Sequence, residues 1–203
     1  MTSSTPGPFR IALFASGNGT NAERIALYFK DNPRFQIGPV FYNRKQAYVA
    51  QRAAKLGIEA VYLPDSQLKE PETVLGLLKT HDITHIVLAG YLSLIPAYLT
   101  AAYPQRIVNI HPALLPAYGG KGMYGHHVHE AVAANREKES GITIHLVDEH
   151  YDRGAILFQA RCPLSPDDTP DSIAGKVHEL EYRHFPEVIE QWALQTLPPF
   201  QAK

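Results

Sequence analysis

The sequence predicts an α/β fold in which helices flank a mostly parallel, twisted sheet, with an antiparallel strand pair in the C-terminal half. Three observations support this prediction. Short apolar runs alternate with helical patterns through the first half of the chain, which is typical of parallel sheets with helices on both faces. A glycine-rich segment, SGNGTN at residues 16–21, separates the first apolar run from the first helical pattern. Residues 148–154 join two later strand-like runs and are too few for a crossover helix, so these runs should pair antiparallel.

Apolar runs bounded by glycine, proline or polar residues predict the strands. The run GITIHLV alternates apolar and polar residues like a strand. The expected strands are residues 10–15, 35–42, 59–63, 84–89, 106–110, 141–147 and 155–161.

Amphipathic or alanine-rich stretches between these runs predict the helices. Gly57 should end the second helix, and Thr169-Pro170 should start the last one. Pro186 falls within the last helix and should kink or interrupt it, because proline lacks the N–H that a helix needs. The expected helices are residues 22–29, 46–56, 70–81, 98–103 and 127–134, and a last one from near Asp171 towards Trp192.

Length and composition indicate one globular domain over residues 1–203, with loose tails at 1–8 and 198–203. A net charge of −1 gives no electrostatic reason to expect a nucleic-acid partner. The single cysteine, Cys162, excludes an internal disulfide and fits a reducing compartment. The sequence has neither a membrane-spanning apolar stretch nor a signal peptide. We therefore expect a cytoplasmic protein.

The segment NIHPALLP begins at Asn109, at the end of the predicted strand over residues 106–110. In open α/β sheets, ligands bind at the carboxyl ends of the strands, where Asn109 and His111 should lie. An amide and an imidazole there could polarise a carbonyl group and move a proton. Alternatively, both side chains could only satisfy backbone groups in a tight turn.

The glycine-rich segment offers a phosphate cradle, because Gly17 and Gly19 let backbone N–H groups point at one spot beside a helix N-terminus. Thr20 and Asn21 could cap that helix or bond a phosphate oxygen. The segment is neither a Walker A loop nor GxGxxG, and a purely structural turn would need the same glycines. Its place in the first βα loop favours a phosphate.

Further ionisable residues stand in the second half. Asp152 could reach His111, orient its ring and favour the imidazolium, whereas Asp148 and Glu149 resemble ordinary turn residues. Glu181 could be a surface carboxylate or a partner of a substrate amine. The histidines at 126, 127 and 129 lack the spacing of a zinc site, so we expect no metal. Residues 118–125 form a glycine-rich loop that could be a lid or a plain surface connection.

The motifs SGNGTN, NIHPALLP, GITIHLVDEHYDRG and EYRHFP occur in one order between residues 10 and 192. In this order they resemble the phosphoribosylglycinamide formyltransferases, folate-dependent enzymes of purine biosynthesis. The resemblance implies a Rossmann-like formyltransferase fold. Ser93, Arg153 and the length of the loop at 118–125 depart from the family's usual pattern.

The resemblance also implies roles for individual residues. Asn109, His111 and Asp152 match the family's catalytic residues. Thr143 and His145 share a strand with family residues near the site. The positions that match binding residues are Gly19, Thr20 and Asn21 for the substrate phosphate, Glu181 for the glycinamide end, and Tyr91, Leu92, Leu94, Asp148 and Asp152 for the folate.

The implied reaction moves a formyl group from 10-formyltetrahydrofolate to the amine of glycinamide ribonucleotide. The Asn109 amide and a protonated His111 would stabilise the tetrahedral oxyanion, and Asp152 would hold the imidazolium. The small-molecule partners are the two substrates, and a homodimer is left open. Two alternatives remain: a sugar-nucleotide N-formyltransferase, in which only the acceptor pocket differs, and a non-catalytic nucleotide-binding module.

Overall fold

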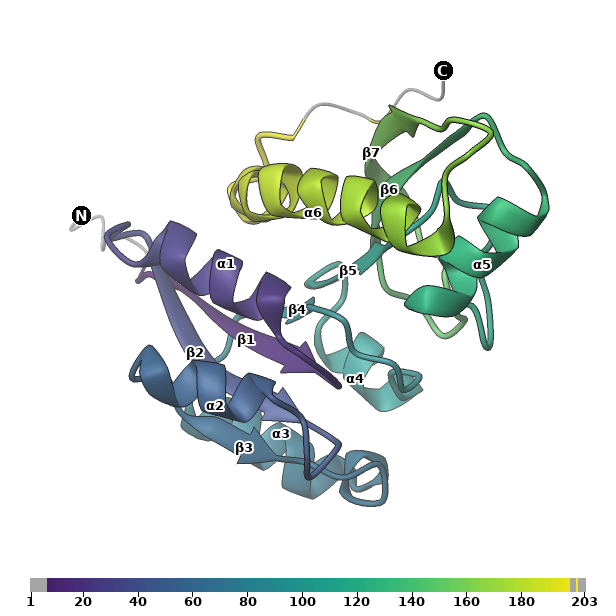
Figure 1. Ribbon diagram of the computed structural model, residues 1–203. Coiled ribbons are helices and arrows are strands. Elements are labelled where there is room, and N and C mark those ends of the chain that lie inside the picture. Colours follow the sequence, from purple (N-terminus) through teal and green to yellow (C-terminus); the bar gives the residue numbers. More distant parts are fainter. Residues whose placement is uncertain (1–6, 198–199, 201–203) are drawn as a thin grey trace.

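A seven-stranded sheet with the order β3-β2-β1-β4-β5-β6-β7 forms the centre of the computed structural model, which describes residues 7–197 and 200 (Figure 1). Strands β1 to β5 run parallel, while β6 is antiparallel to both β5 and β7. The predicted sheet and its antiparallel pair are therefore confirmed. The strands are β1 (Phe9–Ala15), β2 (Phe35–Tyr42), β3 (Ala60–Tyr62), β4 (His85–Leu88), β5 (Ile107–His111), β6 (Glu139–Leu146) and β7 (Ile156–Pro163).

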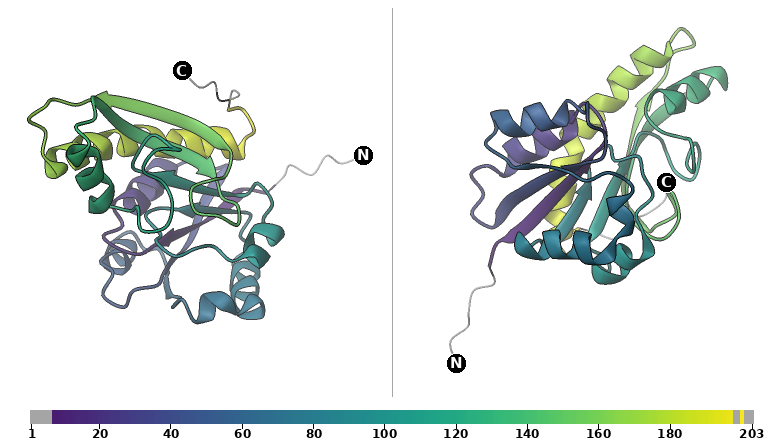
Figure 2. Two further views of the ribbon diagram at one scale, coloured as in Figure 1. Left: turned by 90° about the vertical axis from the view of Figure 1, so that its right-hand side faces the viewer. Right: turned by 90° about the horizontal axis from the view of Figure 1, so that it is seen from below.

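Helices cover both faces of the sheet (Figure 1 and Figure 2). One apolar core contains Ile11 and Leu13 of β1 and receives side chains from α1, α2, α5 and α6; the other contains Ala12 and Phe14 and receives side chains from α3 and α4. This split follows from the alternation of side chains along a strand. The helices are α1 (Thr20–Phe29), α2 (Val49–Lys55), α3 (Pro71–Thr80), α4 (Ala97–Ala102), α5 (His126–Ala134) and α6 (Pro170–Ala193), with a short 3₁₀ helix, η1 (Gln67–Lys69).

Two helix predictions need correction. The second helix begins at Val49 and not at residue 46, because the Ala47 N–H donates to Arg44 in a turn and the Val49 N–H donates to the carbonyl of Gly17. Pro186 does not interrupt α6, which continues to Ala193. Its apolar side chains, such as the buried Phe185 and Ile189, pack against the sheet on both sides of the proline, and this packing offsets the missing hydrogen bond.

The tails predicted at 1–8 and 198–203 lie outside the described residues, apart from residues 7, 8 and 200. In the part of the chain that the structure describes, no helix is both long and apolar enough to cross a membrane.

The strand register brings three loops to one edge of the sheet. Phe14 of β1 pairs with Leu88 of β4, and Leu88 pairs with Asn109 of β5, so the carboxyl ends of these strands lie side by side. Because β6 is antiparallel to β5, His145 lies opposite Asn109 and Thr143 lies opposite His111. The fold thus collects polar residues at the edge where α/β proteins bind ligands.

Two histidines, the partly buried His85 and the buried His129, should make the fold sensitive to acid. Burial, reinforced by Arg106, lowers the pKa of His85 in β4 from 6.5 to about 4. Burial, reinforced by neighbouring histidines, lowers the pKa of His129 in α5 from 6.5 to about 4. The unfolded chain therefore binds more protons between these values, and stability that is present above pH 6.5 is lost as the pH falls towards about 4. We expect the Tm to fall by several degrees between pH 7 and pH 5.

Thermal unfolding of wild type and His85→Phe across this pH range tests the prediction. Phenylalanine keeps the edge-on packing of ring 85 against Trp192, whose centroid lies 5.0 Å away, but cannot titrate. The variant should therefore lose less stability on acidification than wild type. His127→Gln changes an exposed histidine of α5 and is the control. Equal acid sensitivity in wild type and His85→Phe would contradict the contribution of His85 to the loss of stability in acid.

Candidate functional site

A cavity of about 610 Å³ lies at this edge of the sheet. The loop after β1, the loop after β4, the end of β5 and the β6–β7 loop all contribute to its wall. Residues 120–125 and His129 of α5 close another side, so residues 120–125 of the loop predicted as a lid or a surface connection do line the cavity. The lining includes Asn109, His111, Asp152, Gly19, Thr20, Asn21, Glu181, Tyr91, Leu92 and Leu94.

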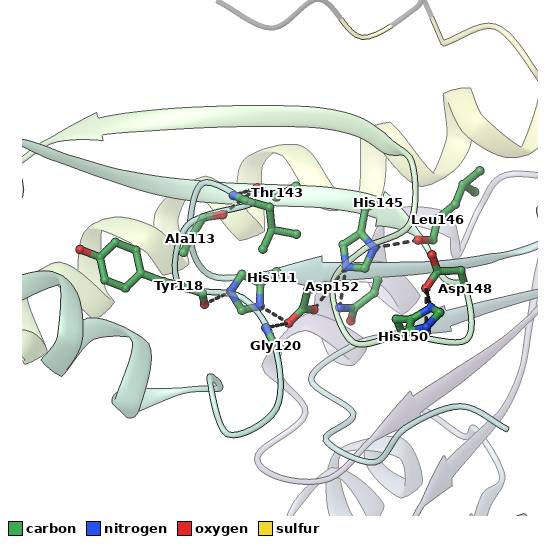
Figure 3. Close-up of polar contacts among 12 residues, drawn as sticks. His111, Ala113, Tyr118, Gly120, Thr143, His145, Leu146, Asp148, His150 and Asp152 are labelled. Atoms are coloured by element: carbon green, nitrogen blue, oxygen red, sulfur yellow. Dashed lines mark hydrogen bonds and ion pairs between the residues drawn. The ribbon is translucent and has the colours of Figure 1, made fainter.

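His111 is held at the end of β5 with only 3 % of its surface exposed. Its Nε2 lies 2.7 Å from the carbonyl oxygen of Tyr118 (Figure 3). A carbonyl can only accept, so Nε2 carries a proton and donates it there. The other ring nitrogen, Nδ1, lies 3.6 Å from Oδ2 of Asp152. The structure therefore brings His111 and Asp152 together, as the sequence predicted.

Asp152 stands in the β6–β7 loop with a left-handed backbone, at a φ of 55°. Its Oδ2 accepts a hydrogen bond of 2.9 Å from the Gly120 N–H, and its Oδ1 lies 3.5 Å from Nε2 of His145. Burial opposes ionisation of this carboxyl, but His145, His111 and the Gly120 N–H outweigh burial and hold its pKa below the usual range. Asp152 is thus a carboxylate at neutral pH.

The charge of His111 reflects opposing effects. Burial lowers its pKa, while Asp152 and the Tyr118 carbonyl raise it and His145 lowers it further; the net direction is downward from 6.5. Asp152 therefore favours the imidazolium, as expected, but burial has the larger effect in the protein without ligands. The neutral imidazole is the prevailing form near neutral pH.

His145 is a member of the site that the sequence placed nearby without assigning it a contact. Its Nδ1 lies 2.7 Å from the carbonyl oxygen of Leu146 and donates to it, while its Nε2 lies 3.1 Å from the amide nitrogen of Asn109 and 3.5 Å from Oδ1 of Asp152. This contact places the Asn109 amide beside His145, and the amide has a second hydrogen that is not directed at the imidazole. The alternating pattern of residues 141–147 carried the signal, because it predicted a strand that could pair beside residue 109.

The glycine-rich loop leads directly into α1. Gly19 is the N-cap of that helix, with a φ of 77° and without a side-chain cap, so neither Thr20 nor Asn21 caps the helix. A Cβ at Gly19 would lie 2.3 Å from Val49 Cγ2 and 2.9 Å from Val49 Cα. The N–H groups of Thr20 and Asn21 belong to the first turn, where no carbonyl precedes them in the helix to accept a bond. They offer donors and a positive helix end to an anion.

Glu181 in α6 is buried, with 6 % of its surface exposed, so the interpretation as a surface carboxylate is wrong. Its Oε2 accepts a hydrogen bond of 2.8 Å from the amide of Asn21. Burial raises the pKa of Glu181, and Asn21 and His178 partly offset this effect. A buried carboxyl thus lies beside the glycine-rich loop at the cavity wall.

Of the residues matched to the folate, all but Asp148 line the cavity. Tyr91 is buried, Leu94 is exposed, and both line the cavity. The Leu92 N–H donates to the Ser16 hydroxyl at 3.0 Å, which ties the loop after β4 to the first loop. Asp148 does not line the cavity; its Oδ1 accepts from the N–H of His150 at 2.8 Å within the β6–β7 loop (Figure 3).

The three histidines of α5 have separate environments. His126 and His127 are exposed and lie 3.5 Å and 3.2 Å from carboxylate oxygens of Glu130, while His129 is buried at the cavity wall. Within residues 7–197, no group of histidine, cysteine and acidic side chains is arranged to hold a metal ion.

Comparisons with known proteins agree with this architecture. The family model described as formyl transferase matches residues 9–189. A phosphoribosylglycinamide formyltransferase of Bacillus subtilis is 34 % identical over 192 residues, covering 90 % of this chain and 93 % of that protein. A chloroplastic phosphoribosylglycinamide formyltransferase of Arabidopsis thaliana is 37 % identical and covers 93 % of this chain. The chain spans 66 % of that plant protein and 60 % of a similar one from Vigna unguiculata.

Solved structures give the same result. The phosphoribosylglycinamide formyltransferase of Streptococcus pneumoniae superposes with a TM-score of 0.80 at 38 % identity, covering 93 % of this chain and 99 % of that one. The enzyme of Anaplasma phagocytophilum reaches a TM-score of 0.83 at 28 % identity and covers 93 % and 88 %. The chain therefore belongs to the formyl transferase family and, within it, to the phosphoribosylglycinamide formyltransferases.

Proposed function

We propose that the protein transfers a formyl group from 10-formyltetrahydrofolate to the amine of glycinamide ribonucleotide. The observation that carries the proposal is the meeting of Asn109, His111 and Asp152 in one cavity, with 3.6 Å between His111 Nδ1 and Asp152 Oδ2. The names of the relatives support the same reaction.

The two substrates would enter from opposite sides of the catalytic residues. The N–H groups of Gly19, Thr20 and Asn21 would bind the phosphate of glycinamide ribonucleotide, since anions favour a helix N-terminus. Glu181 would contact the glycinamide end. Folate would lie along the loop after β4, against Tyr91, Leu92 and Leu94, with Asp152 at its reacting end. Asp148 does not line the cavity, so its proposed contact with folate would require the β6–β7 loop to move.

In the proposed reaction, the substrate amine attacks the formyl carbon, and a carbon–nitrogen bond forms while the formyl oxygen gains negative charge. The free amide hydrogen of Asn109 and the imidazolium form of His111 stabilise that charge. The amine nitrogen then loses a proton, N10 of the folate gains one, and the bond between N10 and the formyl carbon breaks. The pair of His111 and Asp152 relays this proton, directly or through water.

The alternatives make different use of the same geometry. A non-catalytic nucleotide-binding module needs the glycine-rich loop but has no use for a buried imidazole facing a carboxylate. A sugar-nucleotide N-formyltransferase would keep Asn109, His111 and Asp152 and replace the acceptor contacts. The hydrogen bond of 2.8 Å between Asn21 and Glu181 joins the phosphate loop to a carboxyl group, which favours a small acceptor with a phosphate and an amine.

A direct assay tests the proposal. Incubation with 10-formyltetrahydrofolate and glycinamide ribonucleotide should yield formylglycinamide ribonucleotide and tetrahydrofolate in equal amounts. A crystal structure with glycinamide ribonucleotide should place the phosphate at the N–H groups of Gly19, Thr20 and Asn21. Formylation of an amino sugar nucleotide alone would support the alternative enzyme. A phosphate bound elsewhere would overturn the role of the first loop.

Other predictions concern the whole protein. The organisation as one formyltransferase domain over residues 1–203 is supported by the single sheet. The sequence also predicts a cytoplasmic location and no nucleic-acid or membrane partner, and these stay predictions. It leaves open whether the protein forms a homodimer. The plant relatives are named as chloroplastic, so location differs within the family.

A further inference from the structure

The segment from Tyr118 to Gly120 contacts both members of the proposed catalytic pair. The carbonyl of Tyr118 accepts from His111 Nε2 at 2.7 Å, and the N–H of Gly120 donates to Asp152 Oδ2 at 2.9 Å. Between these two contacts, a Cβ at Gly119 would lie 3.3 Å from Asp152 Cβ and 2.5 Å from Leu115 Cδ2. The turn thus approaches the pair so closely that a Cβ at its centre would require the Leu115 and Asp152 side chains to shift.

Tyr118 itself has an unfavourable backbone. Its φ is 57°, in the left-handed region that residues with a Cβ rarely adopt. Such a conformation persists when the surroundings hold it in place. The structure therefore has to provide an anchor for this residue.

The side chain of Tyr118 provides that anchor at a distance from the cavity. Its hydroxyl donates to Glu137 Oε1 at 2.6 Å and accepts from the Asn135 amide at 2.7 Å. Asn135 is the C-cap of α5, and Glu137 follows two residues later, beyond the end of the helix. The ring points away from His111 while the carbonyl faces the imidazole (Figure 3). Among the residues described, Glu137 and Asn135 are not part of the cavity wall.

We propose that Tyr118 is a positioning residue for formyl transfer: its anchored phenol holds the carbonyl that keeps a proton on His111 Nε2 and so leaves Nδ1 facing Asp152. The expected effect of Tyr118 on kcat rests on the proposed function. It gives the end of α5 a role in the reaction through hydrogen bonds alone. The carbonyl of a residue without this anchor would be free to leave the imidazole.

Tyr118→Phe removes the anchor and keeps the backbone carbonyl. We expect kcat to fall roughly threefold to tenfold, as for the loss of one net hydrogen bond, with unchanged KM values. The limb of the kcat–pH profile that His111 controls should move to lower pH, because the Tyr118 carbonyl helps to raise the pKa of His111. Asp152, His145 and His129 also act on the charge of His111 and are unchanged in this variant.

Variants of Glu137, which accepts the hydrogen bond from the Tyr118 hydroxyl, keep the test decisive if Tyr118→Phe folds poorly. Glu137→Ala removes the acceptor and should reproduce the loss of kcat, while Glu137→Gln keeps a carbonyl acceptor and should restore most of it. Tyr28→Phe is the matched control, because Tyr28 donates to Glu190 at 2.7 Å on the surface, outside the cavity wall. Its kcat should equal that of wild type.

Nitrogen NMR of the imidazoles separates this inference from the proposed function. Wild type should show one histidine with a proton fixed on Nε2, whose signal is missing in His111→Gln. Tyr118→Phe should weaken that preference, whether or not the protein formylates glycinamide ribonucleotide. An unchanged His111 signal in Tyr118→Phe would overturn the inference. So would a kcat for Glu137→Gln as low as that for Glu137→Ala. Absence of formylation by wild type would overturn only the proposed function.

Discussion

Asp152→Asn should lower kcat by roughly 10²–10⁴-fold, the usual contribution of a general acid–base group. The substitution keeps the size of the side chain and its acceptor for the Gly120 N–H, but removes the charge that lies 3.6 Å from His111 Nδ1. Without that charge, burial of His111 is opposed only by the Tyr118 carbonyl, so the pKa of His111 falls further and the imidazolium that stabilises the oxyanion becomes harder to form. His111→Ala should cause a loss of similar size.

The double variant distinguishes a coupled pair from two independent residues. If His111 and Asp152 act as one unit, the combined loss should be close to the larger single loss and far from the product of the two. Asp168→Asn is the control, because it breaks a carboxylate–ammonium contact of 2.5 Å with Lys176 that lies outside the cavity wall. A fully active Asp152→Asn protein would contradict the mechanism, and so would multiplicative losses in the double variant.

Gly19→Ala should have the second large effect, on substrate binding. The residue has a φ of 77°, and its Cβ would lie 2.9 Å from the backbone of Val49, so the loop or α2 must move. The left-handed conformation costs about 1–2 kcal/mol for alanine, before the contact with Val49 is counted. Displacement of the N–H groups of Thr20 and Asn21 should raise the KM for glycinamide ribonucleotide about 10- to 100-fold, the range for a lost hydrogen bond to a charged group.

Gly57→Ala separates the cost of the left-handed backbone from the cost of the contact with Val49, both of which affect Gly19→Ala. Gly57 also has a positive φ, of 69°, but no atom lies within 4 Å of a Cβ built there. This variant should therefore show only the backbone cost, seen as a lower Tm, with the KM for glycinamide ribonucleotide unchanged. If Gly19→Ala and Gly57→Ala had the same KM, the phosphate would not bind at the first loop. Steady-state kinetics and thermal unfolding of both variants give the two readouts.

Local sequence patterns were enough to predict the parallel part of the sheet and the loops that carry the candidate functional residues. The apolar run of residues 10–15 predicted a strand, and the glycines after it indicated a loop before a helix. The short connection of residues 148–154 required an antiparallel pair. These conclusions depend on local properties, since strand patterns, glycine and the length of a connection act over a few neighbouring residues.

Which of the candidate residues come into contact, and which of them are charged, depends on long-range packing that local patterns do not show. Glu181 is buried because α6 crosses over the first loop, 160 positions away in sequence from its partner Asn21. His145 joins Asn109 because β6 runs antiparallel to β5, and Tyr118 reaches His111 through its carbonyl, which no side-chain pattern reveals. Packing these segments together also buries His111, and burial lowers its pKa more than the charge of Asp152 raises it. Charge state depends on the full surroundings of a group, and those surroundings come from segments that the sequence separates.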